Sequence, residues 1–430
     1  MLTILLLFLL VLALVVLGVP LVYSLGVAAT TIILSQGSMN TTLLPSRMYA
    51  GVDSFVLVAI PFFVLAAELL SAGGIIQRII HVSRLMIGHL RGGLAQVNIF
   101  SSMVFAGIQA SCTADSAAIG GVMIPAMTKE GYDKDISVVV TSTSSCCGPI
   151  IPPSILMILY AFLTETSVAK LFLGGAVPGI LLGISLMGVT HYWVLKRGYK
   201  RSRETRAALG EIGRATWSAL PALMIPGAVV IGLVGGIVTP TEAGIVACVA
   251  ALFLSGVVYR ELSFSGIVGC IRRAAHTTVT IWAVIAVSRV FSEILVRNMF
   301  AQRMIEAIYW VTESPLGVML LITFFVFLLG MVIDTTPLLI MLASPIHQAG
   351  TLAGIDPVHL GVILVITALI GTVSPPVSLL LCLNCGIAKI PLHETFGVIW
   401  SYLAVMLGVV AVCILIPELV TWLPGLELFQ

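Results

Sequence analysis

Carboxylate and hydroxyl side chains gather in four short segments of an otherwise apolar sequence. The first pair of segments is ASCTADS, residues 110–116, and SSCCGPIIPPS, residues 144–154; the second pair is IDTTP, residues 333–337, and IGTVSPPVS, residues 370–378. A helix that breaks inside a bilayer leaves backbone amides and carbonyls without partners, and each such group costs several kcal/mol in lipid. We therefore expect a ligand or neighbouring protein groups to satisfy these atoms.

The paired segments predict sites for a monovalent cation and for a carboxylate. Freed carbonyls and hydroxyls suit sodium, whereas the N-termini of half-helices carry partial positive charge and unpaired amides, which suit a carboxylate. We expect at least two sodium ions beside one solute. The expected ligands of the first sodium are Thr113, Ser116, Ser145 and Gly148. The expected ligands of the second are Asp334, Thr336, Gly371, Thr372 and Ser374.

Two buried carboxylates are the strongest candidates for solute or ion binding. An ionised aspartate at mid-bilayer is costly and is functional by default, which favours Asp115 and Asp334. Single hydroxyls are weaker candidates, because Ser and Thr in membrane helices usually bond their own backbone or a neighbouring helix. The expected solute-binding residues are Ser111, Asp115, Ser154, Arg297, Asp334 and Ser378.

Other residues are candidates for a structural or coupling role. Glu242 and Arg289 are the charged residues that a buried ion pair would use. Arg297 has two interpretations, a side chain that extends to the membrane interface or a fork for a substrate carboxylate. The prolines that would hold the breaks are Pro152, Pro153, Pro375 and Pro376.

Composition identifies a polytopic membrane protein. The 430 residues are 59% hydrophobic and 9% charged, far from soluble globular composition. The first apolar run has no basic segment before it, so we interpret it as a retained span and not a signal peptide. The eight cysteines include two close pairs in apolar sequence, which favours packing over metal or redox roles.

Missing motifs narrow the chemistry. The sequence contains no GxxxxGK[ST], HExxH or GxSxG, so we expect a transporter and not an enzyme, with no nucleotide and no organic cofactor. No feature indicates a nucleic-acid partner. An alternative of another class is a membrane hydrolase with Asp115 and Asp334 as a dyad, which would turn over without any gradient.

Hydrophobic runs and charge predict the topology. The runs 94–128 and 316–349 are too long for one span and carry polar centres, as expected of re-entrant hairpins. Threading outward from the basic segment 196–214 places most Lys and Arg residues in the cytoplasm and the N-terminus outside. Two amphipathic segments, 75–91 and 297–310, are predicted as arm helices on the membrane surface.

The two halves of the chain repeat one design. GYDKDISVVVTSTSSCCGPIIPPS begins at Gly131 and GIDPVHLGVILVITALIGTVSPPVS begins at Gly354, with Asp133 matching Asp356. The predicted broken helices, 136–163 and 358–385, cross in opposite directions in this threading. Inverted repeats with broken helices are typical of secondary transporters.

The motifs also resemble a known family. GGLAQVNIFSSMVFAGIQASCTADSAAIGGVMIPAMTKEGYDKDI, GMVIDTTPLLIML and SPPVSLLL resemble the large membrane subunit of tripartite ATP-independent periplasmic (TRAP) transporters. The resemblance implies an elevator-type fold of the ion transporter superfamily and sodium-driven uptake of a carboxylate such as sialic acid or a C4-dicarboxylate. It also implies two partners in the bacterial inner membrane and periplasm, a small four-helix membrane subunit and a periplasmic substrate-binding protein.

The resemblance supports particular residues and departs at others. The matching motif positions are Ser111, Asp115, Glu242, Arg297 and Asp334. Many members have S-G-S-A where this chain has Gln109 to Cys112. Thr367 replaces an Asn of the second break, and Ser374 and Ser378 replace a Thr and a Gly.

The resemblance also divides the chain into a scaffold and a transport domain. Scaffold spans and the first arm helix occupy 1–92, the first transport half occupies 93–195 and the basic loop occupies 196–214. Further scaffold spans and the second arm helix occupy 215–312, and the second transport half with the last span occupies 313–430. Proton coupling, or a symporter that works without a binding protein, stays an open alternative.

Overall fold

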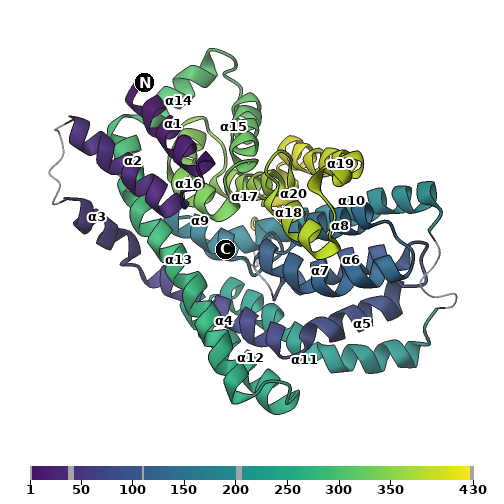
Figure 1. Ribbon diagram of the computed structural model, residues 1–430. Coiled ribbons are helices and arrows are strands. Elements are labelled where there is room, and N and C mark those ends of the chain that lie inside the picture. Colours follow the sequence, from purple (N-terminus) through teal and green to yellow (C-terminus); the bar gives the residue numbers. More distant parts are fainter. Residues whose placement is uncertain (1, 37–42, 109–110, 200–205, 427–430) are drawn as a thin grey trace.

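The protein is built of helices. The computed structural model describes residues 2–36, 43–108, 111–199 and 206–426, and within these ranges there is no β-strand (Figure 1). A helix satisfies all of its own backbone bonds, which an apolar environment requires. The predicted all-α class is therefore confirmed. Six helical segments are long and apolar enough to span a membrane: Phe55–Ala72, Val168–Arg197, Leu209–Val234, Pro240–Val258, Phe264–Arg297 and Leu392–Leu415.

One long helix organises a first group of elements. Helix α13, Phe264–Arg297, has 34 residues and packs against α2, α3 and α4 (Figure 1). The other members of this group are α1 (Leu2–Val16), α2 (Leu21–Gln36), α3 (Leu43–Val52), η1 (Phe55–Val58), α4 (Ala59–Ala72), α5 (Ile75–Ile87), α11 (Leu209–Val234), α12 (Pro240–Phe253), the π-helical turn η3 (Leu254–Val258) and α14 (Phe300–Tyr309).

A second group surrounds helix α17, Pro357–Val373. Every residue of α17 from Val358 to Val373 is buried, which explains its almost uninterrupted apolar sequence. The first half of the chain contributes α6 (Gly93–Ala106), α7 (Cys112–Lys129), α8 (Lys134–Ser144), η2 (Ser145–Cys147), α9 (Ile155–Thr164) and α10 (Val168–Arg197). The second half contributes α15 (Pro315–Gly330), α16 (Thr335–Leu352), α18 (Leu379–Ala388), η4 (Leu392–Thr395), α19 (Phe396–Leu415) and α20 (Glu418–Thr421).

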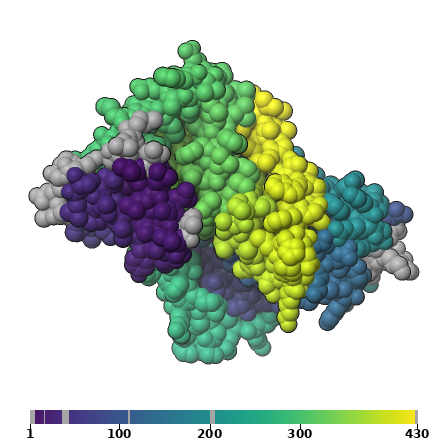
Figure 2. Space-filling view, turned by 45° about the horizontal axis from the view of Figure 1, so that its top comes forward, coloured from purple at the N-terminus to yellow at the C-terminus, as the bar shows by residue number. Residues whose placement is uncertain are grey.

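The two groups meet along α13 and α16. These helices pack against each other, and α9 packs against both α16 and α4. Figure 2 shows the N-terminal helices in purple beside the green segment that contains α13 to α16, with the yellow C-terminal helices next to it. The second group therefore lies beside the long helix over much of its length.

Local residues set the two ends of α13. The helix begins at Phe264, because Ser263 caps it through the amide of Gly266. The expected arm helix 297–310 is wrong at its start, since Arg297 is the last residue of α13. Met299 has a positive φ of 52° and separates α13 from α14, which begins at Phe300.

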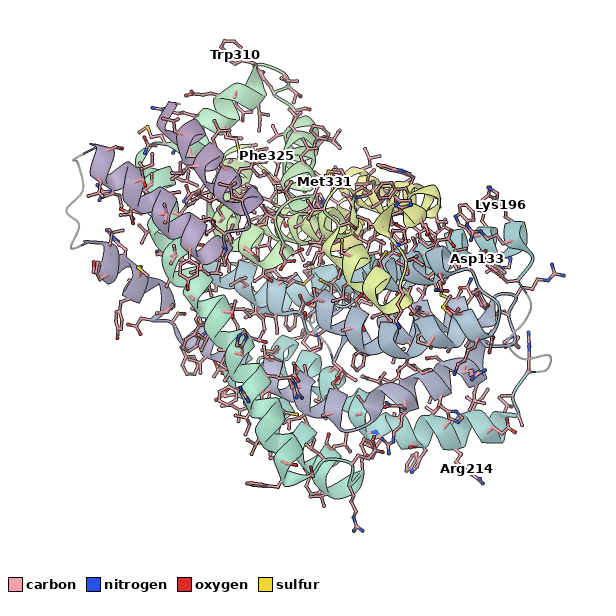
Figure 3. The ribbon with its side chains drawn as sticks, viewed as in Figure 1. Asp133, Lys196, Arg214, Trp310, Phe325 and Met331 are labelled. Carbon is pink, nitrogen blue, oxygen red and sulfur yellow. The ribbon has the colours of Figure 1, made fainter. Side chains whose placement is uncertain are left out.

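An arginine fork joins α8 to α10. Nη1 and Nη2 of Arg197 donate to the two carboxylate oxygens of Asp135 at 2.8 and 2.7 Å, and Nη1 also donates to Asp133 at 2.8 Å. The Tyr199 hydroxyl donates to Asp133 at 2.6 Å. This hydrogen bond, with Arg197, lowers the pKa of the Asp133 carboxyl. Figure 3 places Asp133 and Lys196 at the same end of the molecule, far from Trp310.

Replacing Arg197 with alanine should destabilise the protein. The substitution removes three charge-assisted hydrogen bonds between α8 and α10, a loss on the order of 1–3 kcal/mol. The melting temperature of the purified protein in detergent measures the effect. Arg214→Ala is the matched control, because Arg214 is exposed on α11. Equal melting temperatures for the two variants would contradict a stabilising role for the fork.

Candidate functional site

Both predicted helix breaks are present and close in the same way. Helix α8 passes into η2 and α9 begins only at Ile155, while α17 ends at Val373 and α18 begins at Leu379. The Pro152–Pro153 and Pro375–Pro376 peptide bonds are both cis. The Ser154 hydroxyl donates to the Pro149 carbonyl, and the Ser378 hydroxyl donates to the Val373 carbonyl at 2.9 Å. These two serines satisfy carbonyls that the breaks release.

Asp115 is fully buried in the first turn of α7. Its side chain is 0% exposed, and neither carboxylate oxygen has a hydrogen-bond partner among the described residues. The hydroxyls of Ser102 and Ser145 are its polar neighbours. However, the Ser145 hydroxyl donates to the Thr141 carbonyl at 2.8 Å, and Ser102 bonds to Ser144 at 3.2 Å. The carboxylate is thus held at a helix N-terminus without a fixed donor.

Two asparagines that sequence analysis missed complete a polar layer around this aspartate. Asn98 of α6 donates to the Thr141 hydroxyl at 2.7 Å. Asn384 of α18 donates to the hydroxyls of Ser116 and Ser142 at 2.6 and 2.8 Å. Both are 0% exposed, and polar residues in apolar helices were the signal that could have found them.

The layer has more acceptor oxygens than donors to satisfy them. In this layer, the buried oxygens without a partner among the described residues are both carboxylate oxygens of Asp115, Oδ1 of Asn98 and Oδ1 of Asn384, and Oγ of Ser101, next to Ser102 on α6, is also unpaired. Buried polar atoms are normally paired, so this surplus requires another partner. Oxygen atoms of this kind are what a hard cation or a proton on the carboxylate would satisfy.

The other residues predicted for the first sodium are already engaged locally. Thr113 bonds to Ser111 through their hydroxyls at 3.0 Å, and Ser111 caps α7 through the amide of Ala114. The amide of Gly148 donates to the Ser145 carbonyl at 3.2 Å. Hydroxyl oxygens that donate or are shared in this way retain acceptor capacity.

The residues predicted for the second sodium lie around the start of α16 and the end of α17. Asp334 is the N-cap residue of α16 and its side chain makes no capping bond. Thr372 and Ser374 donate to carbonyls of α17, both at 2.7 Å. The buried hydroxyls of Thr335 and Thr367 have no partner among the described residues.

Gly371 has a packing role in this arrangement. A Cβ atom at Gly371 would lie 2.5 Å from the carbonyl carbon of Gly330, so α15 and α17 touch where neither has a side chain. A Cβ atom at Gly330 would lie 3.1 Å from the carbonyl oxygen of Ala368 and 3.2 Å from Cα of Gly371. The glycine therefore permits the close approach of the two helices beside Thr372.

One cavity lies between the start of α7, which we call the first tip, and the start of α16, which we call the second tip. It has a volume of about 550 Å³ and we call it the central cavity. The first tip contributes Ser111, Cys112 and Thr113, and the second contributes Asp334, Thr335 and Thr336. The facing wall comes from α4 and α13, with Glu68, His276, Thr277 and Thr280. None of the described residues that line it is Lys or Arg.

The structure leaves several predicted residues outside this cavity. Ser154 and Ser378 close the breaks, and Asp115 lies buried behind the first tip. Arg297 lies at the end of α13 and pairs with Glu293 on its own helix at 3.1 Å. Of the predicted solute-binding residues, Ser111 and Asp334 line the central cavity. Gln109 and Ala110, named in the sequence comparison, lie outside the described residues.

The expected buried pair of Glu242 and Arg289 is wrong. Both residues are exposed. Oε2 of Glu242 accepts from the backbone amide of Thr239 at 2.7 Å, and the Thr239 hydroxyl accepts from the amide of Glu242, so Glu242 completes a capping box at the start of α12. The segment TPTE contains the capping-box spacing with proline at the first helical position, and that pattern predicts this local role.

Comparison with known proteins identifies the family. Residues 8–419 match the family described as tripartite ATP-independent periplasmic transporter, DctM component. The chain belongs to this family. The sequence-based expectation of a TRAP large permease is confirmed, and with it a multi-pass membrane protein.

Named relatives of the DctM family match along nearly the whole chain. The sialic acid TRAP transporter large permease SiaM of Vibrio cholerae is 31% identical, covering 96% of each chain. The 2,3-diketo-L-gulonate large permease YiaN of Escherichia coli is 30% identical, covering 94% of each. The isethionate permease DctMQ of Oleidesulfovibrio alaskensis is 33% identical, over 95% of this chain and 64% of that longer protein.

Two solved transporters share the fold. The YdaH transporter of Alcanivorax borkumensis has a TM-score of 0.64 at 13% identity, covering 90% of this chain and 89% of its own. MtrF of Neisseria gonorrhoeae has a TM-score of 0.62 at 10% identity, covering 86% and 84%. At these identities the likeness concerns the arrangement of helices.

Replacing Gly371 with alanine should separate α15 from α17. Because the new methyl group would meet the backbone of Gly330, we expect a loss of about 1–3 kcal/mol in stability, measured as a lower melting temperature in detergent. Gly386→Ala on α18 is the control, since a Cβ there meets no atom within 4 Å. If Gly371→Ala melts at the same temperature as the wild type, the close packing of α15 and α17 is not needed for stability.

Proposed function

We propose that this chain is the permease subunit of a sodium-driven importer of an organic acid anion. The observation that carries the proposal is the meeting of two helix N-termini, those of α7 and α16, at the central cavity, with the unpaired Asp115 carboxylate buried directly behind. First-turn amides and the partial positive charge of a helix N-terminus bind anions. The relatives named for sialic acid, 2,3-diketo-L-gulonate and isethionate support an oxyacid anion as the solute.

Sodium binding would solve an electrostatic conflict at the second tip. Asp334 lines the cavity that is to receive a carboxylate. Two like charges about 4 Å apart repel by about 4 kcal/mol at an effective dielectric constant of 20. A sodium ion held by Asp334 and Thr336, beside Thr372 and Ser374, removes this repulsion. The solute then binds well only after the cation, which is the basis of coupling.

A second sodium ion would satisfy the polar layer around Asp115. The unpaired oxygens of Asp115, Asn98, Ser101 and Asn384 form the donor set, with Ser116 and Ser145 nearby. If more sodium ions enter than the solute has negative charges, import moves net positive charge inward. An inside-negative potential then contributes about 2.3 kcal/mol per net charge per 100 mV. Protonation of Asp115 would also remove the cost of burying its charge, so proton coupling is the second candidate.

Transport requires that the cavity open alternately to the two sides. We infer an elevator motion, in which the second group of helices slides along the first and carries the two tips with it. The resemblance to DctM proteins supports two partners, a small four-helix membrane subunit and a periplasmic binding protein, in the bacterial inner membrane. The predicted orientation places the N-terminus on the periplasmic side.

Uptake into proteoliposomes tests the function. The chain with its small subunit would be given labelled sialic acid, succinate or isethionate, under an inward sodium gradient or a potassium control, each with and without the binding protein. We expect uptake only with sodium and the binding protein together. Uptake that ignores sodium but stops with a protonophore would establish proton coupling, and turnover of a solute without a gradient would indicate an enzyme.

Replacing Asp115 with asparagine should abolish sodium-coupled uptake. The neutral amide removes the charge that a cation would balance, so the rise in melting temperature caused by sodium over potassium should also shrink. Asp53→Asn is the matched control, because Asp53 is exposed between α3 and η1. An unchanged sodium effect on melting and uptake in Asp115→Asn would show that the polar layer binds no coupling ion.

A further inference from the structure

Helix α13 carries two polar clusters on the face that meets the second group of helices. The first cluster, His276, Thr277 and Thr280, lines the central cavity. The second cluster, Ser288, Arg289 and Ser292, borders two further cavities toward the end of the helix. Between them the same face is apolar, with Ile281, Val284 and Ile285. Intervals of three and four residues keep these positions on one side of the helix.

Helix α16 follows that face in the same register. Asp334 to Pro337 line the central cavity opposite the first cluster, whereas Ser344, His347 and Gln348 line the cavity at the second. Arg289 follows Thr277 by twelve residues, and Gln348 follows Thr336 by twelve. Twelve helical residues span about 18 Å, so a shift of that length along α13 would carry the second tip from the first cluster to the second.

The second cluster offers an unpaired guanidinium. Its cavity, about 340 Å³, is lined by α13, the end of α9 and α16. Arg289 is exposed, and within the described ranges it forms no ion pair. Ser288 is buried and its hydroxyl has no partner there. A Cβ atom at Gly51 would lie 2.9 Å from Cβ of Arg289, so α3 holds the base of this side chain in place.

The other charged groups of this cavity are largely committed. Glu293 pairs with Arg297 at 3.1 Å and with Arg47 at 3.7 Å. His347 bonds to the Tyr160 hydroxyl at 3.1 Å. Glu165, at the end of α9, is the remaining acid that lines it. The Arg289 guanidinium is thus the cation available to a bound anion.

We propose that Ser288, Arg289 and Ser292 form the stationary half of the solute site when the hairpin tips stand at the other end of α13. The inference rests on the proposed function, since it requires the second group to slide along this helix. The carboxylate held by the tips would there meet an arginine fork, which binds it with two parallel hydrogen bonds. The first cluster has no Lys or Arg.

This difference gives the transport cycle a direction. Arg289 follows the first cluster toward α14 and Trp310, at the end away from the basic residues Lys196 and Arg214 (Figure 3). By the positive-inside rule that end faces the periplasm, where the solute is received. The solute is therefore bound more tightly on the side where it is received than on the side where it is released.

Arginine variants test the side on which the second cluster acts. Arg289→Ala should raise the KM of binding-protein-dependent uptake by about tenfold or more, because one charged hydrogen-bonding partner of the carboxylate is lost. The solute concentration that gives half-maximal efflux from loaded vesicles should stay unchanged. Arg289→Lys should be intermediate, and His276→Ala should affect efflux and spare the uptake KM. Arg303→Ala on α14 is the control for removal of a positive charge on that side.

Cross-linking tests the motion without relying on activity. Thr336→Cys is combined with Thr280→Cys for the present arrangement or with Ser292→Cys for the shifted one, after Cys112, Cys248 and Cys382 are replaced by serine; the other cysteines are buried. We expect both pairs to cross-link in membranes. If only the Thr280 pair cross-links, the slide does not occur and the proposed elevator fails together with this inference.

Two outcomes would overturn the inference alone. If both pairs cross-link but Arg289→Ala transports like Arg303→Ala, the second cluster does not bind solute. If Glu165→Ala reproduces the effect of Arg289→Ala in both directions, Arg289 is an ion-pair latch to α9 in the shifted state and not an anion site. A higher KM for uptake alone, in Arg289→Ala but not in Glu165→Ala, would support the solute site.

Discussion

Polar backbone atoms freed by a broken helix must find partners where water is scarce, and much of this structure follows from that constraint. The two breaks meet it alike, since Ser154 and Ser378 each donate a hydroxyl to a carbonyl five residues earlier. Helices α8 and α17 then run to the breaks with their residues buried on all faces. The breaks are stable because the half-helices that lead into them are enclosed by the other helices of the group.

The buried polar atoms that lack a hydrogen-bond partner are as informative as those that have one. Around Asp115 the two asparagines donate to hydroxyls, Ser142 and Ser145 donate to backbone carbonyls, and several oxygens remain without partners. A buried carboxylate among surplus acceptors is unstable as an empty site, so binding of a cation would contribute directly to the stability of the folded group. In the proposed function, ion binding and solute binding would thereby be linked through shared helices.

Helix α13 contributes more than support. On the face that meets the second group, Thr277, Thr280 and Arg289 lie where a cavity adjoins the helix. The apolar segment between the two clusters offers no partner to an ion or a carboxylate. Such a segment would keep the solute site from resting between the two ends of its travel.

Local patterns in the sequence are enough to assign the class of this protein. Apolar runs, the basic segment, the repeated PP breaks and the motif matches establish an all-helical permease of the DctM family, because hydrophobicity and helix-breaking residues act locally. The TPTE pattern likewise encodes the cap of α12, although the buried pair we expected for Glu242 and Arg289 was wrong. Which side chains meet was decided only by tertiary structure. Asn384 reaches Ser116 across 268 positions of sequence, and Arg297 lies away from the central cavity, because those distances depend on how α18 and α13 pack and not on any local pattern.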